Sequence, residues 1–518
     1  MSLSSKIPYL LLLILLTSFS LPIPSCHGAR TFTFQMHHGF STPVRKWIRS
    51  RSHHFPLKGT IDYYSALADR DQLLLLRRRL SSINNGSVTF ANGNSTLRLS
   101  SLGFLHYTTV SIGTPSKQFL VALDTGSDLF WVPCDCTSCA PTLTSSYGSD
   151  YEAELNVYHP RGSSTSKRIM CNNSLCGQRN RCLGTFSNCP YTVSYISSDT
   201  STSGILVEDV LHLITEDSPS EVDAWITFGC GQVQTGSFLE FAAPNGLFGL
   251  GMKRISVPSI LSRAGLTADS FSMCFGRDGV GRISFGDKGS PQQDETPFII
   301  DSLHPTYNIS VTQIRVGKNL IDTHFDAVFD SGTSFTYMTD PAYTQLSESF
   351  NLQHSHDTQL PYDSRIPFEN CYKMSSDADS SLIPSISLMM KGGSQYPVYD
   401  PLIVISSGNE LVYCLAVVKS TNISIIGQNF MTGYKVVFDR EKSVLGWEKF
   451  DCYNIERPAN STEVVADGPE TDNYTPEAQK ESESNLQFVM PEASSSSAHW
   501  IYRFWIALYM YMHILFWR

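Results

Sequence analysis

Two stretches of the chain share one pattern, FLVALDTGS at residues 119–127 and AVFDSGT at residues 327–333. In each, an apolar run ends in Asp, which is followed by a small hydroxyl residue, by Gly and then by Ser or Thr. Further apolar or aromatic runs follow at residues 129–132 and 335–338. Apolar runs broken at a glycine predict a strand, a tight turn and a second strand. The chain therefore carries two copies of an Asp-bearing turn.

Each copy has a distant apolar-apolar-Gly partner, GLFGLG at residues 246–251 and IIGQ at residues 425–428. A repeat of roughly 200 residues predicts two related lobes, because solenoid repeats are much shorter. Short β-branched and aromatic runs fill most of the rest, and helical patterns stand out only at residues 257–264 and 341–350. We therefore expect a mainly β protein.

Composition excludes several classes of protein. The 518 residues are 41% hydrophobic and 11% aromatic, which rules out a mainly disordered chain, a collagen and a coiled coil. Only the two ends carry long apolar runs, so a polytopic membrane protein is excluded. A net charge of −10 does not favour a nucleic-acid surface.

The N-terminal end has the layout of a secretory signal peptide, predicted at residues 1–29. The alternative is an uncleaved signal anchor, for which the apolar run is short. Loss of Cys26 leaves an even number of cysteines, which suits disulfides. Asn-x-Ser/Thr sequons also favour a secreted glycoprotein; they begin at Asn85, Asn94, Asn172, Asn308, Asn422, Asn460 and Asn473.

The two flanks of the body differ in charge. Residues 30–80 hold ten Lys and Arg against three Asp and Glu, so this leader should be attracted to the acidic body unless it is only a solvated linker. Residues 453–498 are acidic and poor in apolar residues, which predicts a flexible stalk. For the hydrophobic tail, residues 499–518, we favour a glycolipid (GPI) anchor signal; a transmembrane helix and an interfacial tail are the alternatives.

Asp124 and Asp330 are the candidate catalytic residues. Two carboxylates placed face to face cannot both ionise, so they share a proton. The ionised one then takes a proton from water, and the protonated one supports the carbonyl oxygen of an amide. We expect the surrounding residues of the two turns to support the pair. Ser127 and Thr333 would donate to the outer oxygens, Thr125 and Ser331 would tie the turns together, and glycines would allow the bends; these are Gly126 and Gly332.

These elements resemble the pepsin-type aspartic proteases over roughly residues 100–452. The resemblance implies a bilobal pepsin-like acid protease fold, with an active-site cleft between lobes at residues 96–290 and 291–452. It implies an aspartic endopeptidase that acts on polypeptides at acidic pH as a monomer, without a metal or other cofactor. Residues 30–95 would be an inhibitory prosegment whose Lys or Arg covers the carboxylates. The arginines at residues 77–79 are either a processing site or the charged face of a helix.

Within that family, Trp131 would hydrogen-bond the tyrosine of a flap over the cleft, and Tyr195 is the best candidate for that tyrosine. The alternative is an ordinary strand tyrosine. The usual glycine-rich flap tip is replaced by ISSD at residues 196–199, a departure that bears on flap mobility.

The cysteines between residues 134 and 189 resemble the nucellin-like or nepenthesin-like plant branch, which has a Cys-rich insertion in its first lobe. That branch implies a disulfide between Cys371 and Cys414. Zinc is the alternative for the first cysteines, but secretion favours disulfides. The sequence thus predicts a secreted zymogen tethered to the plasma membrane. A binding protein on the same scaffold, such as a glycosidase inhibitor, and a structural wall glycoprotein are the rival interpretations.

Overall fold

The computed structural model describes most of the chain between residues 30 and 452. It leaves out the predicted signal peptide, the arginines at 77–79, the flap tip at 196–199, the stalk and the tail. The described residues are 30–39, 41, 43–44, 58–68, 71, 106–140, 156–195, 200–214, 221–239, 243, 245–276, 280–301, 305–353, 358–373, 384–399, 401–407, 410–450 and 452. Within these ranges, no helix is both long enough and apolar enough to cross a membrane.

The largest sheet has 14 strands, in the order β12-β24-β23-β10-β11-β1-β2-β3-β9-β4-β8-β7-β5, with β6 paired to β7. Its strands are β1 (Phe32–His38), β2 (His106–Ile112), β3 (Lys117–Asp124), β4 (Trp131–Ser138), β5 (Lys167–Arg168), β6 (Pro190–Tyr195), β7 (Thr200–Ile214), β8 (Glu221–Gln234), β9 (Leu247–Gly249), β10 (Ser270–Phe275), β11 (Val280–Phe285), β12 (Asp294–Pro297), β23 (Tyr434–Asp439) and β24 (Val444–Lys449).

Two smaller sheets are formed by strands between residues 308 and 426. A seven-stranded sheet has the order β18-β17-β13-β14-β22-β15-β21, and a three-stranded sheet has the order β16-β20-β19. Their strands are β13 (Asn308–Val316), β14 (Asn319–Phe329), β15 (Thr336–Thr339), β16 (Cys371–Lys373), β17 (Ile386–Met390), β18 (Gln395–Val398), β19 (Leu402–Ser407), β20 (Glu410–Leu415), β21 (Val417–Ser420) and β22 (Ser424–Ile426).

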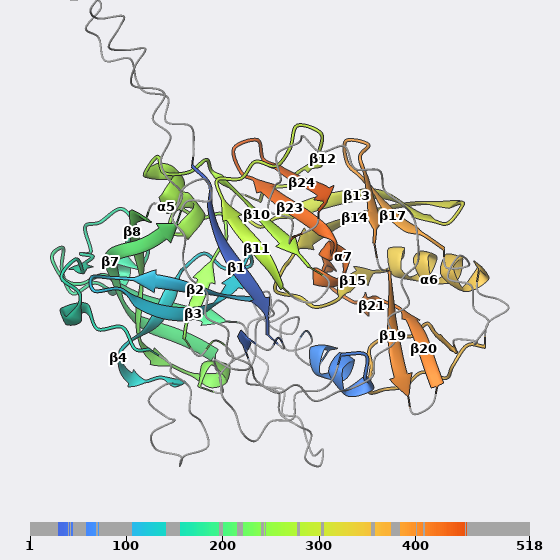
Figure 1. Ribbon diagram of the computed structural model, residues 1–518, viewed down its shortest axis with the longest axis horizontal. Coiled ribbons are helices and arrows are strands. Elements are labelled where there is room, and N and C mark those ends of the chain that lie inside the picture. Colours follow the sequence, from blue (N-terminus) through green and yellow to red (C-terminus); the bar gives the residue numbers. More distant parts are fainter. Residues whose placement is uncertain are drawn as a thin grey trace, which may run out of the picture. The chain divides into compact units, whose positions relative to one another are not determined.

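Helices are few and short, which confirms the prediction of a mainly β, bilobal fold. The two predicted helical patterns form α5 (Val257–Arg263) and α6 (Ala342–Gln353). Further helical elements among the described residues are a stretch at residues 61–68, α7 (Gln428–Met431) and the 3-10 turns η1 (Pro160–Gly162), η2 (Arg179–Arg181) and η3 (Gly236–Phe238). Figure 1 shows β2, β3, β4, β7 and β8 gathered on one side, β17, β19, β20 and α6 on the other, and β10, β11, β23 and β24 between them.

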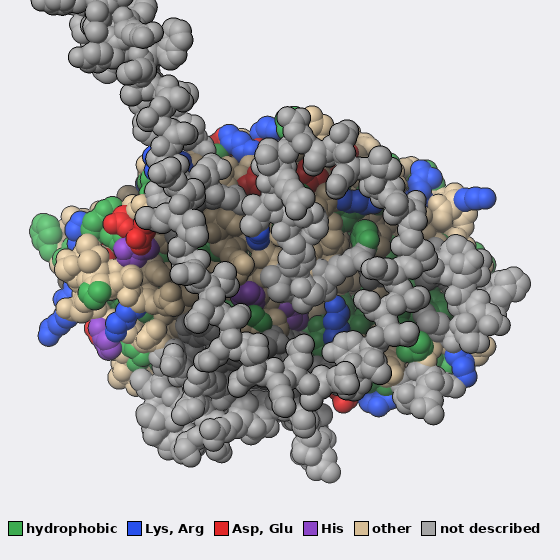
Figure 2. Space-filling model, in the orientation of Figure 1, with side chains coloured by type: hydrophobic (Ala, Val, Ile, Leu, Met, Phe, Trp, Pro, Cys, Tyr) green, Lys and Arg blue, Asp and Glu red, His purple; other side chains and the backbone are tan. Residues whose placement is uncertain are grey.

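Burial explains the apolar runs before the two Asp residues. The last six residues of β3 are all buried, as in an interior strand covered on both faces. The strand that ends just before Asp330, β14, alternates instead between buried and exposed positions. On the face drawn in Figure 2, apolar side chains form only small separate patches among polar atoms.

The leader contributes a strand to the largest sheet. β1 pairs antiparallel with β11 along most of its length and with β2 at its end. Phe32 and Met36 of this strand are fully buried in the hydrophobic core. Figure 1 shows β1 running between β11 and β2. The first part of the leader is therefore an integral part of the folded sheet.

Candidate active site

The two apolar-Gly segments lie directly against the two Asp strands. β3 pairs in parallel with β9, so that Asp124 lies opposite Gly249, and β14 pairs in parallel with β22. A Cβ on Gly249 would stand 2.4 Å from the carbonyl carbon of Asp128, and a Cβ on Gly427 would stand 2.1 Å from the carbonyl oxygen of Phe335. The chain that follows each Asp turn thus passes across the glycine of its partner segment, which leaves no room for a side chain.

The structure brings the two Asp carboxylates together. An oxygen of Asp330 and an oxygen of Asp124 lie 3.1 Å and 3.8 Å from the point where a Cβ on Gly332 would stand. Both residues are buried, with 5% and 8% of their surface exposed. Both also line one cavity of about 470 Å³. Two acids from separate lobes therefore face a space large enough for substrate side chains.

Backbone amides hold the two carboxylates in similar ways. Gly126 N–H donates to Asp124 Oδ1 over 3.0 Å, and Gly332 N–H donates to Asp330 Oδ1 over 3.1 Å. Beneath them, the hydroxyls of Thr125 and Ser331 lie 3.4 Å apart and link the two turns.

The outer hydrogen bonds differ between the lobes. Thr333 Oγ1 donates to Asp330 Oδ2, as expected. Ser127 Oγ is buried and does not donate to Asp124; it lies toward the Tyr195 hydroxyl instead.

Tyr195 and Trp131 meet beside the cavity. Trp131 Nε1 donates to the Tyr195 hydroxyl over 2.9 Å. Phe238 of η3 packs edge-on against both rings, at centroid distances of 4.8 Å and 4.9 Å. Burial, and then the negative charge of Asp124, raise the pKa of Tyr195 far above its usual range. This hydroxyl therefore keeps its proton at neutral and acidic pH. No sequence motif pointed to Phe238.

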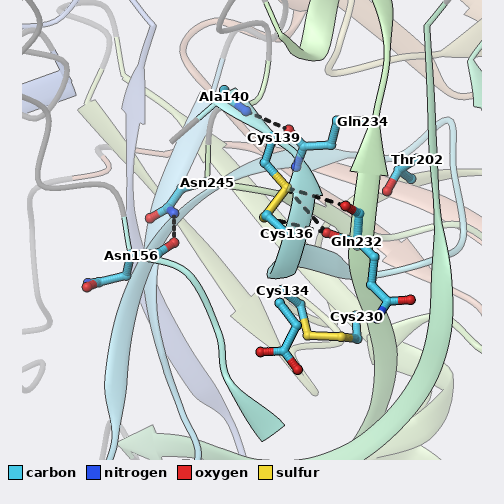
Figure 3. Close-up of a disulfide and its surroundings, with 12 residues drawn as sticks. Cys134, Cys136, Cys139, Ala140, Asn156, Thr202, Cys230, Gln232, Gln234 and Asn245 are labelled. Atoms are coloured by element: carbon cyan, nitrogen blue, oxygen red, sulfur yellow. Dashed lines mark hydrogen bonds between the residues drawn. A yellow bond between two sulfur atoms is a disulfide. The ribbon is translucent and has the colours of Figure 1, made fainter. Parts of the chain in front are cut away.

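Disulfides hold the strand that carries Trp131. Cys134 on β4 is bonded to Cys230 on the neighbouring β8, and Cys136 is bonded to Cys139 just beyond (Figure 3). All cysteines of the described residues form such bonds. The first cysteines, for which zinc binding was the alternative, are therefore paired in disulfides. The other pairs are Cys171–Cys182, Cys176–Cys189, Cys274–Cys452 and Cys371–Cys414.

One wall of the cavity comes from the loop at residues 171–189, which two of these disulfides close. Leu175, Gly177 and Gln178 of this loop line the cavity together with Val193. The resemblance of the cysteines to the nepenthesin-like branch implied an insertion in the first lobe. It gave no sign that the insertion reaches the Asp pair, because its position depends on the long hairpin β6–β7 against which it folds.

Comparisons with known proteins place the chain in a family. Models described as Xylanase inhibitor N-terminal and Xylanase inhibitor C-terminal match residues 106–287 and 306–449. Aspartyl protease family protein 1 of Arabidopsis thaliana is 52% identical over 501 residues, which cover 96% of this chain and 95% of that protein. The chain belongs to the pepsin-like aspartic protease family. Aspartic proteinase-like protein 1 of the same plant is 39% identical, over 84% of each chain.

More distant relatives agree with the predicted branch of aspartic proteases. Aspartic proteinase nepenthesin-2 of Nepenthes gracilis is 28% identical, over 66% of this chain and 77% of that protein. The crystal structure of conglutin gamma, a basic 7S globulin from lupine seeds, has the same fold, with a TM-score of 0.52 and 21% identity over 68% of this chain and 92% of that one. The nepenthesin-like branch is thus confirmed, and the chain is a plant aspartic endopeptidase that acts on polypeptides.

Proposed function

We propose that this aspartic protease cleaves peptide bonds with a water molecule activated between Asp124 and Asp330. The observation that carries the proposal is the approach of both carboxylates to one point beside Gly332. Like charges this close disfavour double ionisation, so the pair holds one proton at working pH. One member is then a base and the other an acid.

The reaction follows from these two roles. The ionised carboxylate takes a proton from water as the water oxygen bonds to the carbonyl carbon, and the carboxylic acid gives its proton to the carbonyl oxygen. In the second step the newly protonated carboxyl gives its proton to the amide nitrogen and the C–N bond breaks, while the other carboxylate takes a proton from a hydroxyl of the tetrahedral intermediate; the products are a carboxylic acid and an amine. The dyad ends with one proton, as it began. An acidic optimum follows, because one carboxyl must stay protonated.

The remaining site residues position the substrate and the dyad. Tyr195 would close over a bound peptide, with its hydroxyl fixed by Trp131. The backbone amides of Gly126 and Gly332 support the carboxylates, as does the Thr333 hydroxyl. Ser127 lines the same cavity, where its hydroxyl could meet a group of the substrate.

We further propose that the protein is a secreted zymogen. Six disulfides are typical of a chain that folds in the oxidising secretory pathway. The docked leader strand β1 supports a prosegment at residues 30–95. Exposed Asn172 and Asn422 are accessible for glycosylation. Residues 499–518 would tether a monomer to the plasma membrane. Release by phosphatidylinositol-specific phospholipase C, with mass spectrometry of both termini, tests the tether.

The dyad is tested by Asp124→Asn and by Asp330→Asn. Each should abolish pepstatin-sensitive cleavage of an unfolded protein at acidic pH, because an amide cannot replace the base or the shared proton. Asp326→Asn is the matched control, since Asp326 lies on β14 four residues before Asp330 and its side chain is exposed. Persisting activity in either dyad variant contradicts the mechanism. A wild-type protein without any acid protease activity would favour a binding protein on the same scaffold.

A further inference from the structure

The second part of the leader docks on the second lobe. Residues 61–68 form a helical stretch, which Figure 1 shows beside β19. Just before it, the Ser406 N–H donates to the Gly59 carbonyl oxygen over 2.7 Å. Tyr64 packs against Phe335 at a ring distance of 6.5 Å. The buried side of this stretch belongs to the same apolar cluster as residues around the catalytic turns.

This docking ends in a fully buried acid, Asp71. Its carboxylate accepts from the Ser334 N–H, with both oxygens at 2.9 Å, and from the Phe335 N–H at 2.9 Å. The hydroxyls of Ser334 and Tyr337 donate to it over 2.8 Å and 3.3 Å. Four donor groups therefore surround one carboxylate.

These donors lie at the edge of the active site. Ser334 and Phe335 continue directly from the turn Asp330–Thr333, and Gly332 and Thr333 line the cavity that holds both catalytic acids. The Ser334 carbonyl accepts from the Asn429 N–H over 3.1 Å, which ties the backbone that carries the two N–H donors to α7. All four donor groups belong to residues 334–337 and none to the leader.

Their chemistry selects a carboxylate. A carboxylate only accepts hydrogen bonds, and it needs several donors when it is buried. Two adjacent backbone N–H groups and two hydroxyls supply that set. A side-chain amide in the same position would turn its NH2 group toward N–H donors and leave polar groups unsatisfied.

We propose that Ser334, Phe335 and Tyr337 form a carboxylate-binding subsite of the cleft. In the full chain the subsite is filled by Asp71, and after displacement of the leader it takes an Asp or Glu side chain of the polypeptide substrate. The substrate part rests on the proposed function. The leader thus binds its own enzyme through the group that a substrate would offer.

The first experiment does not need catalysis. In the full-length Asp124→Asn protein, Asp71→Asn should raise hydrogen exchange of residues 61–68 about tenfold, since hydrogen bonds to a charged group are lost. Asp62→Asn is the matched control, because this exposed acid lies in the same helical stretch. Ser334→Ala removes a single donor and should give a smaller rise. Unchanged exchange in both Asp71→Asn and Ser334→Ala overturns the subsite, and so does an equal rise in Asp62→Asn.

The second experiment tests the substrate. Full-length Asp71→Ala protein is given peptide pairs that differ only by Glu or Gln at one position, at about pH 5.5, where carboxyl side chains are ionised. One position should show a preference for Glu of about tenfold in kcat/KM, and Ser334→Ala should reduce it. Equal rates for every pair overturn the substrate part. If no peptide is cleaved while the exchange result holds, the proposed catalysis fails and the carboxylate subsite stands.

Discussion

Trp131 and Tyr195 are joined by a buried hydrogen bond of 2.9 Å between an indole N–H and a phenolic oxygen. The first residue opens β4, and the second ends β6. The bond therefore links the strand that leaves the first Asp turn to the β6–β7 hairpin. Because the Tyr195 pKa is raised far above its usual range, the hydroxyl keeps its proton throughout the working pH range.

Trp131→Phe removes this donor and keeps an aromatic ring. We expect kcat/KM for a peptide substrate to fall by about tenfold, the worth of one buried hydrogen bond. Tyr195→Phe should cause a similar loss, and the double variant should lose little more, because both changes remove one interaction. Trp225→Phe is the control, since Trp225 is 42% exposed on β8. Additive losses in the double variant would mean that the two residues act separately.

The meeting of Asp124 and Asp330 at one cavity was predictable from sequence because its signal is local and repeated. Asp124 and Asp330 each end an apolar run and precede a glycine turn, and each has an apolar-Gly partner. Sterics explain why the apolar partner segment contains a glycine: the chain beyond the Asp turn leaves no room for a Cβ on Gly249. The same reasoning misjudged Ser127, since the rotamer of a serine hydroxyl is set by its neighbours.

Other parts of the site had no local signal. Asp71 is one of three acids in a basic leader, and its donors follow it by more than 260 residues. Phe238 lies in a short turn with no motif. Leu175 is an ordinary residue in a loop whose cysteines predict disulfides but give no direction in space. Such contacts depend on tertiary packing, which a single sequence does not specify.

Gly427→Ala should disrupt the second Asp turn. The added Cβ would meet the Phe335 carbonyl oxygen at 2.1 Å, so the backbone must move. We expect a loss of about 3 kcal/mol in the free energy of unfolding, typical of overpacking, together with a near-complete loss of activity. Gly184→Ala is the control, because a Cβ there meets nothing within 4 Å. Denaturant unfolding followed by a peptidase assay measures both effects; unchanged stability would show that the turn adapts.

Leu175→Ala should change substrate preference and leave the dyad intact. Leu175 lines the cavity from the disulfide-closed loop. Its truncation to Ala removes apolar contact surface and enlarges the cavity there. We expect kcat/KM to fall about tenfold for peptides with a large apolar side chain in this pocket, and to change little for small ones. Leu183→Ala is the matched control, since Leu183 lies in the same loop and is fully exposed. An equal loss for all peptides would point to a damaged fold instead.

The leader strand β1 contains a histidine that opposes docking in acid. His37 lies opposite Val280 of β11, and its Nδ1 is buried and accepts or donates no hydrogen bond within the described structure. Burial lowers the pKa of His37 below its ordinary value of 6.5. The next residue of β1, His38, packs edge-on against His106, with the two ring centroids 5.5 Å apart.

The sign of the pH effect follows from linkage. When the pH falls below 6.5, an undocked His37 takes up a proton that the docked strand resists, so acid weakens the docking of β1. The contribution of neutral His37 to docking is fully present above that pH. It is lost progressively as the pH falls through the lower pKa of the docked state. Hydrogen exchange of β1 in full-length protein should therefore accelerate between neutral pH and about pH 5, after correction for the intrinsic rate. His37→Leu should shift this acceleration to lower pH, and His159→Asn, at an exposed site, should leave it unchanged. If His37→Leu keeps the wild-type profile, other groups drive the release of the leader in acid.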